Sequence, residues 1–195
     1  MRYIASLLAY QKKEENFHSG ICSGIIGSDS LFPPMSSVVR ILGIDPGYAT
    51  IGFAVLEKNG QKVHIIDFGV ITTPADMLFQ KRLKSIADDI AEIMTKFTPD
   101  FMAIEKLFWG ANVDNAMGVA QARGVILLQA AKQNIPIREF SPNEVKSQLV
   151  GNGKAPKFQI QNILKMRLGL AEIPKPDDAA DALAIALIAS EANGF

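Results

Sequence analysis

Residues 38–58 read VVRILGIDPGYATIGFAVLEK, and this stretch contains the pattern that decides the fold. Two runs rich in β-branched and aromatic residues, at 38–45 and 51–58, flank a short Pro-Gly turn. A third run, KVHIIDFGVIT at 62–72, follows an Asn-Gly turn. Runs of this composition, joined by such short turns, predict three consecutive antiparallel strands.

The rest of the chain alternates helical and strand patterns. In chain order we expect a helix over about 78–96, a strand at 100–105, a helix over about 112–133, a strand at 135–140, and further helices after Ser141. Alternating strands and helices predict parallel crossover connections. The sequence therefore predicts an α/β fold, with a mixed five-stranded sheet flanked by helices.

Length and composition predict one domain. The chain has 195 residues, 48% of them hydrophobic, which is enough for one substantial core. We assign this domain to 38–195. Residues 1–37 lack a sustained period and include a Gly/Ser-rich tract. They predict an N-terminal extension, which is either a flexible leader or the product of a start site upstream of the natural one, since Met35 directly precedes the first strand pattern.

Charge and cysteine content bear on the partners of the protein and on its cellular compartment. Lys plus Arg equals Asp plus Glu at 20 each, so the overall charge neither requires nor excludes a polyanionic partner. Cys22 is the only cysteine, which excludes an internal disulfide and fits a reducing compartment, by default the cytoplasm. No apolar run approaches the roughly 20 residues needed to span a bilayer. We expect a protein without a membrane partner.

Two carboxylates end predicted strands. Asp45 follows the apolar run RILGI, and Glu105 ends the buried strand DFMAIE. The ends of strands next to glycine turns are where α/β sheets place their chemistry. Asp45 has an alternative explanation, because Asp often caps a Pro-Gly turn. Alternation places Glu105 on the same face as Ala103.

A third acidic group lies in the C-terminal stretch PKPDDAADALAIALIAS, residues 174–190. Asp177 and Asp178 stand at the start of a predicted helix, where acidic residues stabilise the positive end. Asp181 shares a face with the apolar residues that should contact the sheet, and an unpaired buried carboxylate there costs several kcal/mol. Spacing of three residues lets Asp178 and Asp181 point to one side, and Asp177, four residues before Asp181, could serve the same role.

If that helix crosses the strand ends, four carboxylates converge, and they repel each other unless a hard divalent cation is bound. Mg²⁺ is the natural ion and Mn²⁺ an alternative, since the chain offers no His/Cys set for zinc. Clusters of this kind hold two ions about 4 Å apart, one activating a water and one stabilising the leaving oxygen. The chemistry indicated is phosphodiester hydrolysis.

Five motifs occur in an order and spacing that resemble the RuvC family of Holliday junction resolvases: ILGIDPG, DFMAIEKLF, AQARG, VKSQLVGNGKAPK and PDDAADALAIA. The resemblance runs from about Arg40 to Ala189. It implies a ribonuclease H-like fold and a homodimer that cuts four-way DNA junctions by paired, symmetric, metal-dependent nicks in recombination and repair. It also makes branch-migration proteins of the RuvA and RuvB type candidate partners.

The resemblance assigns roles residue by residue. The catalytic, metal-binding carboxylates are Asp45, Glu105, Asp178 and Asp181. Asp177 falls where the family often has no acidic residue, so we interpret it as an N-cap. Phe108 falls on the family's aromatic residue that stacks at the opened junction, and stacking on a base is worth about 1–3 kcal/mol. The alternative for Phe108, and equally for Trp109, is a place in the core.

Basic residues supply the expected DNA contacts. Between 138 and 175 there are seven basic residues and three acidic ones. Lys146 and Lys157 fall on lysines that matter for DNA binding and cleavage in the family, and Lys154 lies in the glycine-bearing loop GNGKAPK. A solvated helix face is the alternative explanation for each of these lysines. Arg123 could contact either DNA or carboxylates.

Small residues follow two faces of the helix predicted over about 112–133, and one of these faces could meet a second subunit or simply allow close packing on the sheet.

Three rival functions stay open. A related nuclease acting on RNA should lack part of the motif set. The sugar kinase, actin and chaperone superfamily requires a second nucleotide-binding half. A DNA-binding module without catalysis has no use for four carboxylates.

Overall fold

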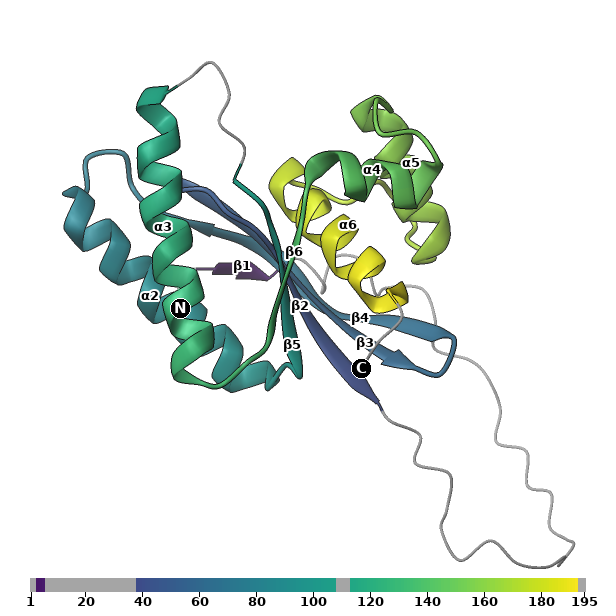
Figure 1. Ribbon diagram of the computed structural model, residues 1–195, viewed down its shortest axis with the longest axis horizontal. Helices are drawn as coiled ribbons and strands as arrows, with labels where there is room; N and C mark the ends of the chain where they lie inside the picture. Colours follow the sequence, from purple (N-terminus) through teal and green to yellow (C-terminus); the bar gives the residue numbers. More distant parts are fainter. Residues whose placement is uncertain (1–2, 6–37, 108–112, 193–195) are drawn as a thin grey trace, which may run out of the picture.

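The computed structural model describes residues 3–5, 38–107 and 113–192, and the structural statements below concern these residues. Their centre is a mixed sheet (Figure 1) with the strand order β1-β4-β3-β2-β5-β6. Five strands match the predicted elements: β2 (Val39–Asp45), β3 (Thr50–Asn59), β4 (Lys62–Thr72), β5 (Phe101–Glu105) and β6 (Ile137–Phe140). The first three are antiparallel, whereas β5 runs parallel to β2, and β6 runs parallel to β5.

A sixth strand, β1 (Tyr3–Ala5), adds to the five that the sequence predicts. It pairs antiparallel with the free edge of β4, where Ile4 lies opposite Val70. Three residues are too short a run to show the alternation by which strands are recognised in a sequence. The N-terminal extension therefore contributes a piece of the sheet that its composition did not indicate.

Helices cover both faces of the sheet (Figure 1). One face carries α2 (Phe79–Phe97) and α3 (Val113–Lys132), and the other carries α4 (Pro142–Val150), α5 (Lys157–Arg167) and α6 (Asp177–Glu191). The predicted helix after Ser141 is confirmed, with the Ser141 hydroxyl accepting the Glu144 N–H at 3.2 Å in a capping box. Within the described part of the chain, every helix is too short or too polar to cross a bilayer.

Alternation along the central strands divides the core into two. In β2, Leu42 and Ile44 face α2 and α3, where they join a cluster that includes Ile86 and Ile90. Ile41 faces the other way, into a cluster formed largely by α6. Because β2 is buried on both faces, its sequence is a nearly continuous apolar run.

Two glycines let α6 lie directly on the sheet. A Cβ atom at Gly43 would collide with the main chain of Ala182 and would come within 2.7 Å of the Ala186 Cβ. A Cβ at Gly52 would collide with the main-chain carbonyl of Asp178. The alanine-rich sequence of α6 and these glycines are complementary, since small residues on both sides permit the close approach. This contact sets the first turn of α6 beside the end of β2.

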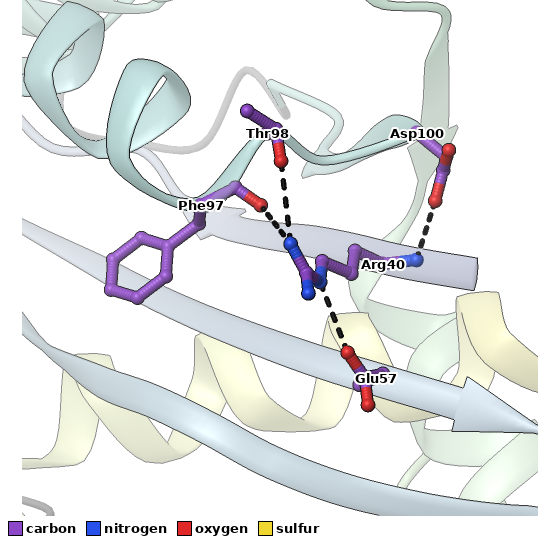
Figure 2. Close-up of polar contacts among 5 residues, drawn as sticks. All are labelled: Arg40, Glu57, Phe97, Thr98 and Asp100. Carbon is purple, nitrogen blue, oxygen red and sulfur yellow. Dashed lines mark hydrogen bonds and ion pairs between the residues drawn. The ribbon is translucent and has the colours of Figure 1, made fainter. Parts of the chain in front are cut away.

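Arg40 fastens the opposite end of β2 (Figure 2). Its Nε donates to Glu57 Oε2 at 3.0 Å, and its main-chain N–H donates to Asp100 Oδ2 at 2.7 Å. Its Nη1 lies 3.3 Å from both the Phe97 carbonyl oxygen and Thr98 Oγ1, at the C-terminal end of α2. A cation is favourable at that end of a helix. Arg40 thereby joins β2, β3 and α2 far from the carboxylates.

Candidate active site

Asp45 and Glu105 end neighbouring parallel strands. Ile44 of β2 is paired with Ile104 of β5, so the residues that follow them leave the sheet side by side. Glu105 shares the face of Ala103, which is the face that α6 covers. Both carboxylates are partly buried. The fold therefore sets two acidic groups at one edge of the sheet, next to the first turn of α6.

Asp178 and Asp181 approach from α6. Gly52 is the partner of Asp45 in the β2–β3 ladder, and the main chain of Asp178 lies against Gly52. The close approach has an electrostatic consequence at Asp45. Burial raises the pKa of Asp45 to about 8, with further contributions from the negative charges of Glu105, Asp181 and Asp178, while Lys157 opposes the rise.

The pKa values of Glu105 and Asp181 are raised as well. Burial and the charge of Asp181 raise the pKa of Glu105 to about 7, against the positive charge of Lys146. Burial raises the pKa of Asp181, and Lys157 partly offsets this rise. The structure thus brings together all four carboxylates that the sequence singled out, and the charges of Glu105, Asp178 and Asp181 all oppose the ionisation of Asp45.

Lys157, the first residue of α5, lies at this centre. Its Nζ is 2.9 Å from Asp181 Oδ2 and 3.3 Å from Asp177 Oδ2. Burial lowers the pKa of the Lys157 ammonium, but the two carboxylates outweigh that effect and the net shift is upward. The lysine therefore stays charged and neutralises part of the acidic group.

Asp177 does not cap α6 through its side chain, so the N-cap interpretation is wrong. The N-cap residue is Pro176, without a side-chain cap, and Asp177 is the first helical residue. Its carboxylate accepts a hydrogen bond from Gln161 Nε2 at 3.0 Å, in addition to the pair with Lys157. With both of its partners on α5, the Asp177 side chain joins α5 to α6.

A pocket of about 290 Å³ opens beside the carboxylates, between α4, α5 and α6. Its polar lining consists of Glu105, Asp181, Lys146 and Lys157, and its apolar lining of Pro142, Val145, Ile160, Ala184 and Ile185. Lys146 and Lys157 thus come from two different helices to the same opening. Carboxylates that can bind metal ions, with lysine side chains beside them, suit a substrate that carries a phosphate group.

The donor chemistry fits a hard divalent cation. Asp45, Glu105, Asp178 and Asp181 offer only carboxylate oxygens, the ligands that Mg²⁺ and Mn²⁺ prefer. Burial and mutual repulsion raise the pKa values of Asp45, Glu105 and Asp181, and a bound cation would offset both effects. Over 38–107 and 113–192, no three His, Cys, Asp or Glu side chains already stand in a metal-ligating arrangement. The carboxylates are neighbours, but their side chains do not form a preorganised coordination site.

Lys154 and Arg123 do not line the pocket beside the carboxylates. Lys154 is exposed in the loop between α4 and α5, where its N–H donates to Asn152 Oδ1 at 3.0 Å. Arg123 contacts a carboxylate, since its Nη2 lies 2.8 Å from Glu139 Oε1, and its Nε donates to the Glu105 carbonyl oxygen at 3.2 Å. Phe108 and Trp109 fall outside the described residues.

Sequence reasoning missed two features near the site. Phe158, directly after Lys157, has 65% of its surface exposed at the start of α5. Its position next to a predicted DNA-binding lysine was the available signal. Arg123 supports the end of β5 through the carbonyl of Glu105, and no sequence pattern indicates a contact between residues 18 apart.

The strand order, the mixed pairing and the acidic residues at the ends of β2 and β5 define a ribonuclease H-like protein of the nuclease type. The particular family follows from sequence. The profile described as crossover junction endodeoxyribonuclease RuvC matches residues 41–189, and the chain belongs to this family.

Individual relatives agree. The chain is 51% identical over 148 residues to the crossover junction endodeoxyribonuclease RuvC of Thermotoga petrophila, covering 76% of this chain and 90% of the relative. Identity to the protein of the same name from Halothermothrix orenii is 50% over 147 residues, covering 75% and 89%. The structure of Thermus thermophilus RuvC in complex with a Holliday junction substrate superposes with a TM-score of 0.73, at 32% identity over 76% of this chain and 91% of that chain.

Proposed function

We propose that this protein resolves four-way DNA junctions by paired symmetric phosphodiester nicks, using a divalent metal, in recombination and repair. The observation that carries the proposal is the meeting of Asp45 and Glu105, at two strand ends, with Asp178 and Asp181 on α6. Family membership and the junction complex of the Thermus relative support the choice of substrate.

The proposed cofactor is Mg²⁺, with Mn²⁺ as a substitute, at two ions per active site. The four carboxylates would hold the ions, which when bound supply an activated water and stabilise the leaving oxygen. The four carboxylates come from β2, β5 and α6, so two strands and one helix orient the metal ligands. Arg123 assists by fixing the carbonyl of Glu105.

The lysines are proposed to bind the DNA backbone. Lys146 and Lys157 line the opening next to the carboxylates, where they can contact the phosphate to be cut. Lys154, in its exposed loop, is placed for a phosphate farther along the strand. For Phe108, base stacking at the opened junction is the proposed role. Arg123 reaches DNA only if its contact with Glu139 is exchanged, and its DNA contact stays a prediction.

We propose a homodimer formed through α3, so that two active sites can act on one junction. The helix packs its buried residues, such as Ala122 and Ile126, on the sheet. Met117 and Leu128 have 56% and 52% of their surface exposed on the outward side, where Gly124 has open space above it.

Proteins of the RuvA and RuvB type are candidate partners. A cytoplasmic location belongs to the same proposal, supported by the single cysteine.

One experiment tests the activity. The purified chain is incubated with Mg²⁺ or Mn²⁺ and a synthetic four-way junction, and in parallel with a linear duplex of the same sequence and an RNA hairpin. We expect paired nicks in opposing strands of the junction alone. The matched control is Asp45→Asn, which should still bind the junction in a gel-shift assay but should lose cleavage. Cleavage of the duplex or the hairpin at an equal rate, or wild-type rates for Asp45→Asn, would contradict the proposal.

A further inference from the structure

Arg82 is a buried cation on α2, beneath the turn that follows Asp45. It is 5% exposed, and its Nη2 donates to the carbonyl oxygen of Pro74 at 2.6 Å. Its Nη1 lies 3.5 Å from the carbonyl oxygen of Tyr48, and its guanidinium carbon lies 5.1 Å from the centre of the Tyr48 ring. Its buried Nε has no hydrogen-bond partner. A buried charge with an unsatisfied donor is costly, so its contacts with this turn call for an explanation.

The turn that Arg82 contacts is tightly folded. A Cβ atom at Gly47 would collide with the carbonyl oxygen of Thr50, so the main chain closes on itself there. The Thr73 hydroxyl donates to the Tyr48 carbonyl at 2.9 Å, and the Thr73 N–H donates to the Ala49 carbonyl at 2.9 Å. Arg82 and Thr73 therefore approach the same carbonyl, which fixes the turn three residues after Asp45.

The Tyr48 ring extends this support to both helices on that side of the sheet. It lies 6.4 Å from the Phe79 ring of α2 and packs against Gly118 of α3, where a Cβ would come within 3.2 Å of the ring. The Asp45 carboxylate, in contrast, faces α6 on the other side. Asp45 thus faces one side of the sheet, whereas Tyr48, three residues later in the same turn, is held by contacts on the opposite side.

We propose that Arg82 is a positioning residue for the metal-dependent reaction: it sets the direction of the Asp45 carboxylate by fixing the carbonyl of Tyr48, without touching Asp45, DNA or metal. The inference rests on the proposed function, because it assigns Asp45 to metal binding. Displacement of a reacting group by about 1 Å can lower a rate about 100-fold. Removing the guanidinium should therefore affect catalysis more than binding.

The test compares Arg82→Met and Arg82→Lys with wild type, and uses Arg40→Met as the matched control, because Arg40 fastens the other end of the same strand (Figure 2). Three quantities are measured: the single-turnover cleavage rate, the junction Kd without metal, and the rise in Tm on adding Mg²⁺. For Arg82→Met we expect a rate about 10- to 100-fold lower, a Kd within about threefold of wild type and a smaller rise in Tm. Arg82→Lys should restore part of the rate, and Arg40→Met should cleave at the wild-type rate.

Equal cleavage rates for Arg82→Met and Arg40→Met would overturn the inference, and so would a Kd that rises in step with the loss of rate. Should Arg82→Met fail to fold, Arg82→Lys and Thr73→Val decide: wild-type rates in both would overturn the inference, and a severalfold loss in both would support it. A wild-type chain that cuts no junction overturns the proposed function alone, because the Mg²⁺-dependent rise in Tm still tests whether Arg82 positions Asp45.

Discussion

At the scale of single residues, Asp45 stands in surroundings that oppose its ionisation. Burial and the charges of three neighbouring carboxylates raise the pKa of Asp45 from its ordinary value of 3.8 to about 8. Burial and the charge of Asp181 raise the pKa of Glu105 from 4.5 to about 7. In the unfolded chain both groups lose their protons near pH 4. Between about pH 4 and pH 8 the folded protein therefore holds more protons than the unfolded chain, and its stability must fall as the pH rises.

This sign gives the first prediction. Without metal, the free energy of unfolding should decrease from about pH 5 to about pH 8.5, and Asp45→Asn should flatten that decrease because it removes one of the repelling charges. At pH 8 we expect the variant to be more stable than wild type by roughly 0.5–2 kcal/mol. Urea unfolding at several pH values, with EDTA present, measures this. Two superimposable pH profiles would show that folding does not raise the pKa of Asp45.

The contacts of Asp181 and Asp177 show which partners of a charged side chain the sequence predicts and which it does not. Asp181 was correctly singled out because a carboxylate on an apolar helix face needs a partner, and Lys157 provides one at 2.9 Å. Asp177 had a sufficient local explanation as a cap, yet its carboxylate binds Gln161 and Lys157 of another helix. Local rules failed there because the side chain's partners come from 16 and 20 positions away in the chain.

At the scale of elements, the contact between α6 and the sheet determines where two of the four carboxylates lie. The second prediction concerns Gly43, which faces Ala182 and Ala186 at close range. Gly43→Val should push α6 away from β2 and lower stability by roughly 1–3 kcal/mol, the usual cost of overpacking. It should also reduce junction cleavage, because Asp178 and Asp181 move with the helix.

The matched control is Gly124→Ala. Gly124 lies within α3 with nothing within 4 Å of an added Cβ, so this change should gain about 0.5–1 kcal/mol instead. Thermal unfolding measures both variants, and a cleavage assay is added for Gly43→Val alone, because Gly124 lies on the face of α3 proposed for the dimer. A Gly43→Val protein with wild-type stability would mean that α6 can sit farther from the sheet than the structure has it.

The third prediction concerns α3 as an element. If its outward side forms the proposed dimer, Leu128→Glu should convert the dimer to a monomer, because an unpaired charge would be buried in the interface. Light scattering after size-exclusion chromatography measures the mass. Met166→Glu is the control, since Met166 is 76% exposed on α5, across the sheet from α3. An unchanged mass for Leu128→Glu would exclude this face as the dimer contact.

At the scale of the whole molecule, β1 joins the N-terminal extension to the edge of β4, level with the carboxylates in the ladder: Ile4 pairs with Val70, Val70 with Gly52, and Gly52 with Asp45. The strand is only three residues long, and two other strands, β4 and β3, separate it from the strand that ends in Asp45. Its few ladder hydrogen bonds contribute about 0.5–1.5 kcal/mol each. The carboxylates themselves belong to other elements.

The fourth prediction follows. A chain that begins at Met35 should lose roughly 1–4 kcal/mol of stability and should keep its cleavage rate, since β2, β5 and α6 remain intact. Thermal unfolding and junction cleavage of the full and shortened chains, side by side, provide the measurement. A shortened chain that folds but does not cleave would assign the extension a part in the reaction.

Much of the architecture is determined by the sequence itself. Periodicity and turn residues predicted five strands, their antiparallel and parallel parts, and the helices between them, because alternation and helical spacing are local properties of the chain. The acidic residues at the ends of β2 and β5 could be found for the same reason. The family resemblance then predicted a ribonuclease H-like resolvase, which the family match confirms.

The tertiary structure alone decided which distant groups meet. The sequence shows neither that Gly43 and Gly52 admit α6 to the sheet, nor that Arg82 supports the turn after Asp45 from the opposite face. It also gave no sign that Arg123 holds the carbonyl of Glu105, or that β1 extends the sheet. Such contacts depend on register and on the approach of backbones to within a few ångströms. Those quantities arise only when the whole chain packs, because no local pattern encodes them.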